Sequence, residues 1–157
     1  MKTCVIYASK TEATKKCAYK IQKALHCDIF DLDVEDINPE NYDFIVIGSP
    51  IRMGMIHKNV KKWVHNNLSV LLRKQTALFV CCGFEENKEK YFQENFPKEL
   101  VSAALTTETF GGEIDLKKQK GIEKMIVKKV LSTHPKEVKL NEENINLFLE
   151  KVQSEIL

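Results

Sequence analysis

Three hydroxyl side chains, Ser9, Thr11 and Thr14, lie within six residues near the start of the sequence. They follow residues 2–8, an apolar and β-favouring run that predicts a buried strand. They lead into residues 13–25, where apolar side chains recur at the spacing of one helix face. A strand that enters a helix through hydroxyls is an anion site, because free backbone N–H groups and the helix dipole converge there. Since Ser and Thr also cap the helices of most α/β proteins, these residues alone leave helix capping and phosphate binding open.

A second segment with the character of a binding loop covers residues 48–57, after the short apolar run 44–47. Gly48 and Gly54 permit backbone conformations that other residues avoid, and Pro50 stiffens the turn. Its soft apolar side chains, placed where solvent would otherwise reach them, are Met53, Met55 and Ile56. A planar, polarisable ring would explain this placement, and folding back onto the core is the alternative.

Strands and helices alternate along the whole chain. The predicted strands cover residues 2–8, 27–32, 44–47, 76–80 and 105–110. The predicted helices cover residues 13–25, 56–68, 86–100 (which Pro97 ends or kinks), 116–131 and 141–156, the last capped by Asn141. This alternation implies a parallel sheet with helices on both faces. We therefore expect one α/β domain over residues 1–157: a three-layer flavodoxin-like sandwich with a five-stranded parallel sheet in the order 2-1-3-4-5.

Composition narrows the classes of function. The 157 residues include 24 Lys and Arg against 22 Asp and Glu, so the net charge of +2 gives no general attraction to nucleic acid. No apolar run approaches the ~20 residues of a membrane span, and we expect no signal peptide. Five cysteines, an odd number without metal-ligand spacing, predict reduced thiols, a cytoplasmic location and no metal site.

Two stretches resemble the flavin loops of flavodoxin-like proteins. Residues 9–14, Ser-x-Thr-x-x-Thr, resemble the FMN phosphate loop, which usually reads Ser/Thr-x-Thr-Gly-Asn-Thr. Residues 47–57, IGSPIRMGMIH, are similar to the second flavin loop of menaquinone-dependent, flavodoxin-type protoporphyrinogen oxidases, and flavodoxin-like quinone reductases have a related loop. The resemblance implies FMN as the cofactor. The FMN-binding residues that it implies are Ser9, Lys10, Thr11, Glu12, Ala13, Thr14, Ser49, Pro50, Ile51, Arg52, Met53, Gly54, Gly83 and Phe84.

The sequence departs from this pattern in three places. Glu12 stands where flavodoxins usually have glycine, which puts an acid beside the proposed phosphate among neighbouring lysines. Met53 replaces an aromatic residue, and the lysine-rich residues 113–131 replace an aromatic- and arginine-rich segment of the oxidases.

Arg52 is the candidate catalytic residue, because it would stabilise negative charge on the reduced flavin. It would equally serve to bind an acidic substrate or to form a surface ion pair. His57 is the one histidine that we single out for testing beside the proposed flavin.

Two functions follow from the resemblance. The first is an FMN-dependent oxidoreductase of the protoporphyrinogen oxidase type, which passes electrons to quinone. The alternative is an electron-carrier flavodoxin without a substrate of its own. Carriers generally dock through an acidic face, and the isoelectric point near 8.2 favours the enzyme.

Residues 116–131 form either a packed helix or a basic amphipathic segment on anionic membrane, which would place the protein at the inner membrane face. The sequence predicts neither the substrate nor the oligomeric state.

Overall fold

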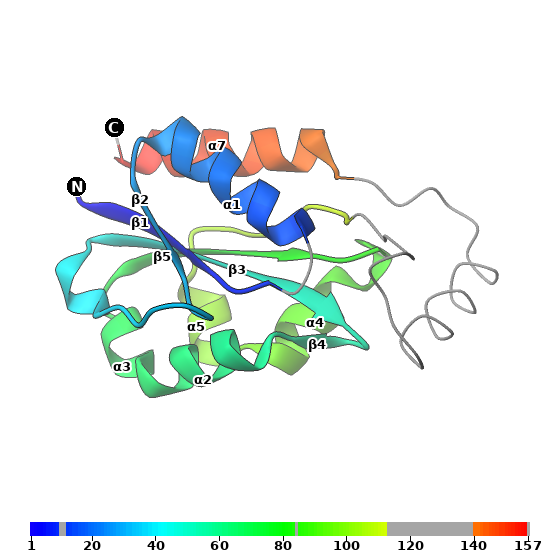
Figure 1. Ribbon diagram of the computed structural model, residues 1–157, viewed down its shortest axis with the longest axis horizontal. Coiled ribbons are helices and arrows are strands. Elements are labelled where there is room, and N and C mark those ends of the chain that lie inside the picture. The colour runs from blue at the N-terminus through cyan, green and yellow to red at the C-terminus, as the bar shows by residue number, and fades with distance from the viewer. Residues whose placement is uncertain (10–11, 84, 113–139, 157) are drawn as a thin grey trace.

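The computed structural model describes residues 1–9, 12–83, 85–112 and 140–156 (Figure 1). The strands are β1 (Thr3–Tyr7), β2 (Asp28–Asp31), β3 (Phe44–Arg52), β4 (Met55–Ile56), β5 (Gln75–Cys81) and β6 (Thr107–Thr109). The α-helices are α1 (Glu12–Leu25), α2 (Lys58–Asn66), α3 (Leu68–Leu71), α4 (Lys88–Asn95), α5 (Lys98–Ala103) and α7 (Glu142–Ile156). Two 3-10 turns, η1 (Pro39–Asn41) and η2 (Glu85–Asn87), complete the described elements.

The central sheet confirms the predicted fold class and strand order. Five strands pair in parallel in the order β2-β1-β3-β5-β6, which is the predicted 2-1-3-4-5 once the short strand β4 is set aside. β4 is a sixth strand that the sequence did not predict, and it pairs antiparallel with β3. Because β1, β3 and β5 are adjacent and parallel, their carboxyl ends lie at one edge of the sheet.

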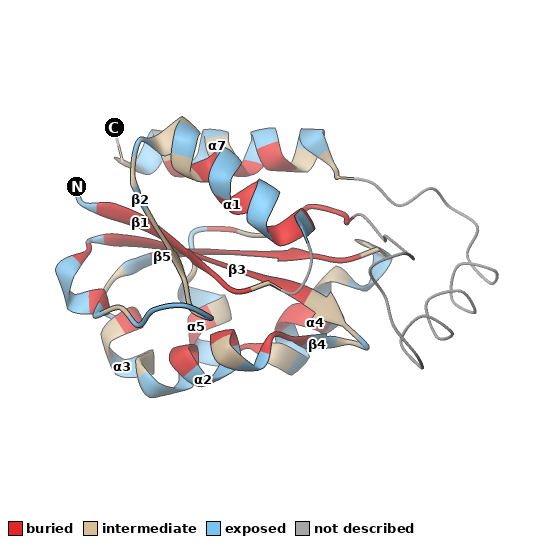
Figure 2. Cartoon of the chain, viewed as in Figure 1, coloured by how far each residue is buried: buried red, intermediate tan, exposed pale blue. Residues whose placement is uncertain are grey.

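Helices cover both faces of this sheet, which explains why the middle strands β1, β3 and β5 are buried along most of their length (Figure 2). Alternate residues of β1, β3 and β5 point to opposite faces. One face packs against α1 and α7 and includes Val5, Val46 and Phe79. The other packs against α2, α3, α4 and α5 and includes Ile6 and Ile47. Figure 1 shows the resulting three layers, with α1 and α7 together on one side.

The predicted end of the third strand, after residue 47, is wrong, because β3 continues to Arg52 and turns back into β4. The turn residues are Met53 and Gly54, with φ of 53° and 78°. Positive φ at both central residues is the signature of a two-residue type I′ hairpin, whose twist matches that of its strands. The following helix therefore begins at Lys58 rather than at residue 56.

Gly48 was predicted to allow an unusual backbone conformation, but the structure requires glycine there for lack of space. It lies within β3, and a Cβ there would come within 2.0 Å of Cζ of the Phe79 ring. Phe79 cannot easily move aside, since it stacks on Phe110 with ring centroids 4.8 Å apart. Close packing across the sheet therefore requires glycine at this position, rather than an unusual backbone conformation.

The remaining boundaries follow local chemistry. Pro97 divides the predicted helix 86–100, because α4 ends before it and α5 begins after it. Asn141 caps α7 as predicted, accepting a hydrogen bond from the backbone N–H of Asn144 at 3.0 Å.

Among the described residues, no helix is both long and apolar enough to cross a membrane. The predicted segment 116–131 lies outside the residues that the structure describes.

Candidate functional site

The two predicted flavin loops and the predicted site residue Gly83 meet at the carboxyl edge of the sheet. Ser9 follows β1, Ser49 and Pro50 lie in the last part of β3, and Gly83 follows β5. The strand register places Tyr7 opposite Gly48 and Pro50 opposite Cys81, so these chain segments are neighbours. The helix α1 begins just after the first loop, and its N-terminus is directed to the same edge (Figure 1). This is the switch point of the strand order, where ligands bind in open α/β sheets.

Thr14 is the most informative residue of the first loop. Its side chain is fully buried, and Oγ1 has no hydrogen-bond partner. The hydrogen bond to Cys17 and burial raise the pKa of the nearby Cys81 thiol, and Thr14 opposes this shift. Sulfur is a weak partner, however, and the geometry leaves Oγ1 without a hydrogen bond. A buried hydroxyl without a partner costs about 1–3 kcal/mol. A hydroxyl unsatisfied in this way is a ready donor for a ligand at the helix N-terminus.

The other residues of the first loop differ in exposure. Ser9 is half-buried, Ala13 is buried and Glu12 is exposed. Glu12 opens α1, where a carboxylate is favourable for the helix dipole but repels a bound anion. Lys10 and Thr11 lie outside the described residues.

Ser49 is fully buried, and its hydroxyl is engaged within its own segment. It accepts a hydrogen bond from the His57 backbone N–H at 2.8 Å and donates one to the Pro50 carbonyl at 2.9 Å. The His57 side chain caps α2, with Nδ1 accepting from the Asn59 N–H at 3.1 Å. Its Nε2 lies 3.4 Å from the Asp33 carboxylate, which follows β2. These bonds fix the segment from β3 to α2 and give His57 a positioning role here.

The hairpin that joins β3 and β4 presents two methionines to solvent. The Met53 side chain is 73% exposed and that of Met55 is 64% exposed, so they do not fold back onto the core. The hairpin is held from α4, where Asn95 accepts from the Ile56 N–H and donates to the Gly54 carbonyl at 2.9 Å. Of the other predicted residues here, Ile51, Arg52 and Gly54 are half-buried and Pro50 is buried.

Gly83 is half-buried at the end of β5, and Phe84 lies outside the described residues. The backbone before Gly83 is fixed by a hydrogen bond from the Cys82 N–H to the Gly111 carbonyl at 2.9 Å. Within the described ranges, no group of three or more His, Cys, Asp or Glu side chains is arranged to hold a metal ion.

Sequence reasoning missed Asn95 and Asp33, which support the second loop from distant elements. An asparagine in a charged helix and an aspartate in an acidic connector give no local signal of such contacts. The β3–β4 hairpin did leave a signal, because Met53 and Gly54 form a two-residue turn between the strand-forming pairs 51–52 and 55–56.

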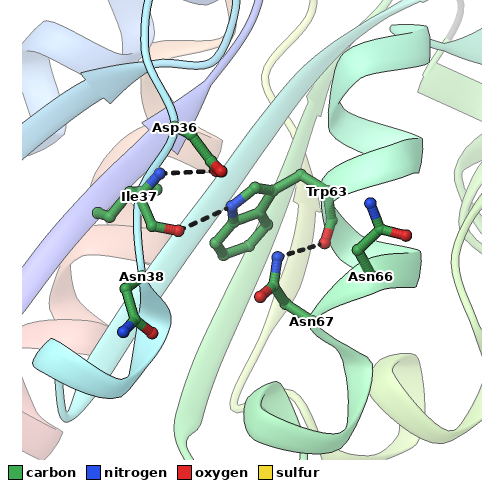
Figure 3. A pocket seen from close by; sticks show the side chains of 6 residues that line it. All are labelled: Asp36, Ile37, Asn38, Trp63, Asn66 and Asn67. Carbon is green, nitrogen blue, oxygen red and sulfur yellow. Dashed lines mark hydrogen bonds between the residues drawn. The ribbon is translucent and has the colours of Figure 1, made fainter.

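A hollow of about 410 Å³ lies between α2 and the segment that joins β2 to β3 (Figure 3). It is lined by Asp36, Ile37, Asn38, Trp63, Asn66 and Asn67. One bond attaches the two walls, since Trp63 Nε1 donates to the Ile37 carbonyl at 3.2 Å. Within the α2 wall, Asn67 Nδ2 donates to the Trp63 carbonyl at 2.8 Å. None of the predicted site residues lines it.

The chain is similar to several known proteins. It is 33% identical over 94 residues to the flavodoxin-like domain-containing protein BilS of Clostridioides difficile, covering 55% of this chain and 49% of that protein. It is 32% identical over 98 residues to the uncharacterized protein MJ0298 of Methanocaldococcus jannaschii, covering 60% of this chain and 63% of that protein. The chain thus spans about half to two thirds of the length of these relatives.

Solved structures share its fold. A flavoprotein from Lactobacillus acidophilus, crystallised in complex with FMN, matches with a TM-score of 0.56 and 19% identity, over 69% of this chain and 92% of that one. The WrbA-like flavodoxin of Agrobacterium tumefaciens matches with a TM-score of 0.51 and 16% identity, over 85% of this chain and 98% of that one. A family model described as a flavodoxin domain matches residues 4–140. The chain therefore belongs to the flavodoxin domain family.

Proposed function

We propose that this chain binds one FMN at the carboxyl edge of its sheet, with the phosphate at the N-terminus of α1. The observation that carries the proposal is the buried Thr14 hydroxyl, which has no hydrogen-bond partner. A phosphate oxygen would supply an acceptor for it, and the free N–H groups at the start of α1 would supply further donors. FMN in the Lactobacillus acidophilus flavoprotein, a relative in fold, supports this choice of ligand.

The β3–β4 hairpin is suited to cover one edge of the isoalloxazine ring. Its methionines expose flexible, polarisable side chains, which pack well on planar groups. Asn95 and Ser49 hold the hairpin and its base in place, so little ordering would accompany binding. Arg52, at the end of β3, would offset negative charge that develops on the ring.

When bound, FMN supplies electron and hydride transfer, and the protein supplies position and electrostatics. The chain would then act as a flavin-dependent oxidoreductase. The finer proposal, an oxidase of the protoporphyrinogen type that passes electrons to quinone, is supported by the loop sequence at residues 47–57. A carrier flavodoxin is the second candidate. An anaerobic reductive titration followed by absorbance separates them, since uptake of electrons in pairs favours the enzyme and uptake one at a time favours the carrier.

Binding itself is tested with two matched variants, Thr14→Val and Thr3→Val. Each removes a buried hydroxyl that lacks a partner, but Thr3 lies at the opposite end of β1. We expect Thr14→Val to weaken FMN binding by about 1.5–3 kcal/mol, the value of a hydrogen bond to a charged group, and Thr3→Val to leave it unchanged. Both should leave the FMN-free protein as stable as before or more stable, because an unsatisfied polar atom is lost.

Fluorescence titration with FMN measures the affinities, and urea unfolding measures the stabilities. Equal FMN affinity in wild type and Thr14→Val would overturn the assignment of the phosphate to α1. Weaker binding in both variants would show that the effect of Thr14→Val is not local.

A further inference from the structure

Two thiols meet beneath the first loop. Cys17 lies on α1, three residues after Thr14, and Cys81 is the last residue of β5. Both side chains are buried, and Cys81 Sγ donates a hydrogen bond to Cys17 Sγ across 3.7 Å. Single buried cysteines usually behave as small apolar side chains. Here two sulfurs from different elements face each other at the carboxyl edge of the sheet.

The geometry favours this pair over other pairings of the five cysteines. A disulfide has an S–S length of about 2.05 Å, so the two sulfurs need to approach by roughly 1.7 Å from where they stand. Both belong to the core beneath α1 and α7, whereas Cys4 lies in the core on the opposite face of the sheet. Cys27 is half-exposed after α1.

We propose that Cys17 and Cys81 form an oxidisable pair that closes to a disulfide when a peroxide reaches it, and that closure weakens FMN binding. The effect on FMN binding rests on the proposed function, whereas the formation of the disulfide does not. With hydrogen peroxide as the oxidant, the Cys17 sulfur attacks one oxygen and breaks the O–O bond, and after proton transfer the products are a sulfenic acid and one water. The Cys81 sulfur then attacks the Cys17 sulfur, forms the S–S bond and releases the second water. The two sulfurs lose two electrons, which reduce the peroxide.

The surroundings of the two thiols indicate which of them reacts first with peroxide. The hydrogen bond to Cys17, followed by burial, raises the pKa of Cys81 well above its usual value. Cys81 is the hydrogen-bond donor and Cys17 the acceptor, so the Cys17 sulfur is the one placed to be oxidised first. The raised pKa of Cys81 slows the second step, because its thiolate is the attacking form. Burial of both sulfurs makes the reaction slow while the native packing holds.

Closure and FMN would compete through α1. Thr14 and Cys17 are one helical turn apart on the buried face of this helix. Drawing Cys17 toward β5 moves the first turn of α1 and with it the Thr14 hydroxyl. By linkage, a disulfide that weakens FMN by some factor is itself disfavoured by bound FMN by the same factor.

The first experiment tests the disulfide without FMN. The wild-type chain is treated with hydrogen peroxide and its thiols are counted after denaturation, with five thiols before oxidation. We expect a fall to three, and a cross-linked pair of tryptic peptides covering residues 17–20 and 75–88. Because Cys82 shares the second peptide, Cys82→Ser should still cross-link, whereas Cys81→Ser should not. Unchanged thiols, or a cross-link that survives in Cys81→Ser, would overturn the proposal.

The second experiment measures FMN affinity of the reduced and the peroxide-treated wild type. We expect oxidation to weaken binding by about 5- to 150-fold, the usual range of coupling between sites, and dithiothreitol to restore it. Saturating FMN should slow the loss of thiols. Equal affinity in both forms overturns the coupling while the disulfide stands. If the reduced chain binds no FMN, the proposed function fails together with the coupling, and the first experiment alone decides the disulfide.

Discussion

At the scale of single residues, Met53 holds a backbone conformation that methionine disfavours. Its φ of 53° lies in the left-handed region, at a turn position where asparagine and glycine are preferred. We therefore expect Met53→Asn to stabilise the protein by about 1 kcal/mol, because such strain is typically worth 1–3 kcal/mol. Urea unfolding measures the change.

Met55→Asn is the matched control, since Met55 is similarly exposed but lies in β4 and is not among the residues with positive φ. It should not stabilise the protein. If the strained Met53 is kept because it contacts the flavin, Met53→Asn should also weaken FMN binding, and Met55→Asn less so. Lower stability of Met53→Asn would contradict the strain argument.

At the scale of elements, β3 and β5 pack through the Gly48–Phe79 contact. Gly48→Ala places a methyl group within 2.0 Å of Phe79, whose ring is held by Phe110. We expect it to destabilise the protein by about 3 kcal/mol, the upper end for overpacking. Combining it with Phe79→Leu should cost less than the sum of the single changes, because the two residues share one space.

Gly112→Ala is the control for glycine replacement, because its nearest neighbour would be 3.4 Å away. It should change the free energy of unfolding by less than about 1 kcal/mol. Thermal and urea unfolding of the four variants complete the comparison. Additive effects of Gly48→Ala and Phe79→Leu would show that the steric contact is not the cause.

How much the sequence revealed depends on whether a signal is local. Apolar runs and alternation predicted the strand order, and the hydroxyl spacing predicted where α1 begins. The two residues of the type I′ turn, Met53 and Gly54, do indicate a hairpin in the sequence, although we predicted a loop there. The reason for Gly48 and the support from Asn95 both depend on residues more than 30 positions away, so no local pattern carries them. The unpartnered Thr14 hydroxyl likewise emerges only from packing.

At the scale of the whole molecule, two weakly acidic side chains, one half-buried and one buried, hold their protons more tightly in the folded chain. Burial, with a contribution from Asp28, raises the pKa of Cys27 from 9.0 to about 11. Burial, with a contribution from Asp31, raises that of Tyr7 from 10.0 to about 12. In this range the folded state binds more protons than the unfolded chain, so stability falls as pH rises.

We expect the free energy of unfolding to be level up to about pH 9 and to decline from there through pH 11 and above. Urea unfolding across this range, with reductant present, measures the slope. Cys27→Ala and Tyr7→Phe should each make the decline shallower, since each removes one titrating group. A decline as steep in both variants as in the wild type would mean that other groups cause it.

The central claim is that α1 receives the phosphate of FMN, and a comparison of FMN with riboflavin tests it most directly. The two ligands carry the same ring, and only FMN has the phosphate. Calorimetric titration of the wild-type chain should give at least about tenfold tighter binding of FMN, since one hydrogen bond to a charged group is worth 1.5–3 kcal/mol. This preference should shrink in Thr14→Val. Equal affinities for FMN and riboflavin, or binding of neither, would contradict the account.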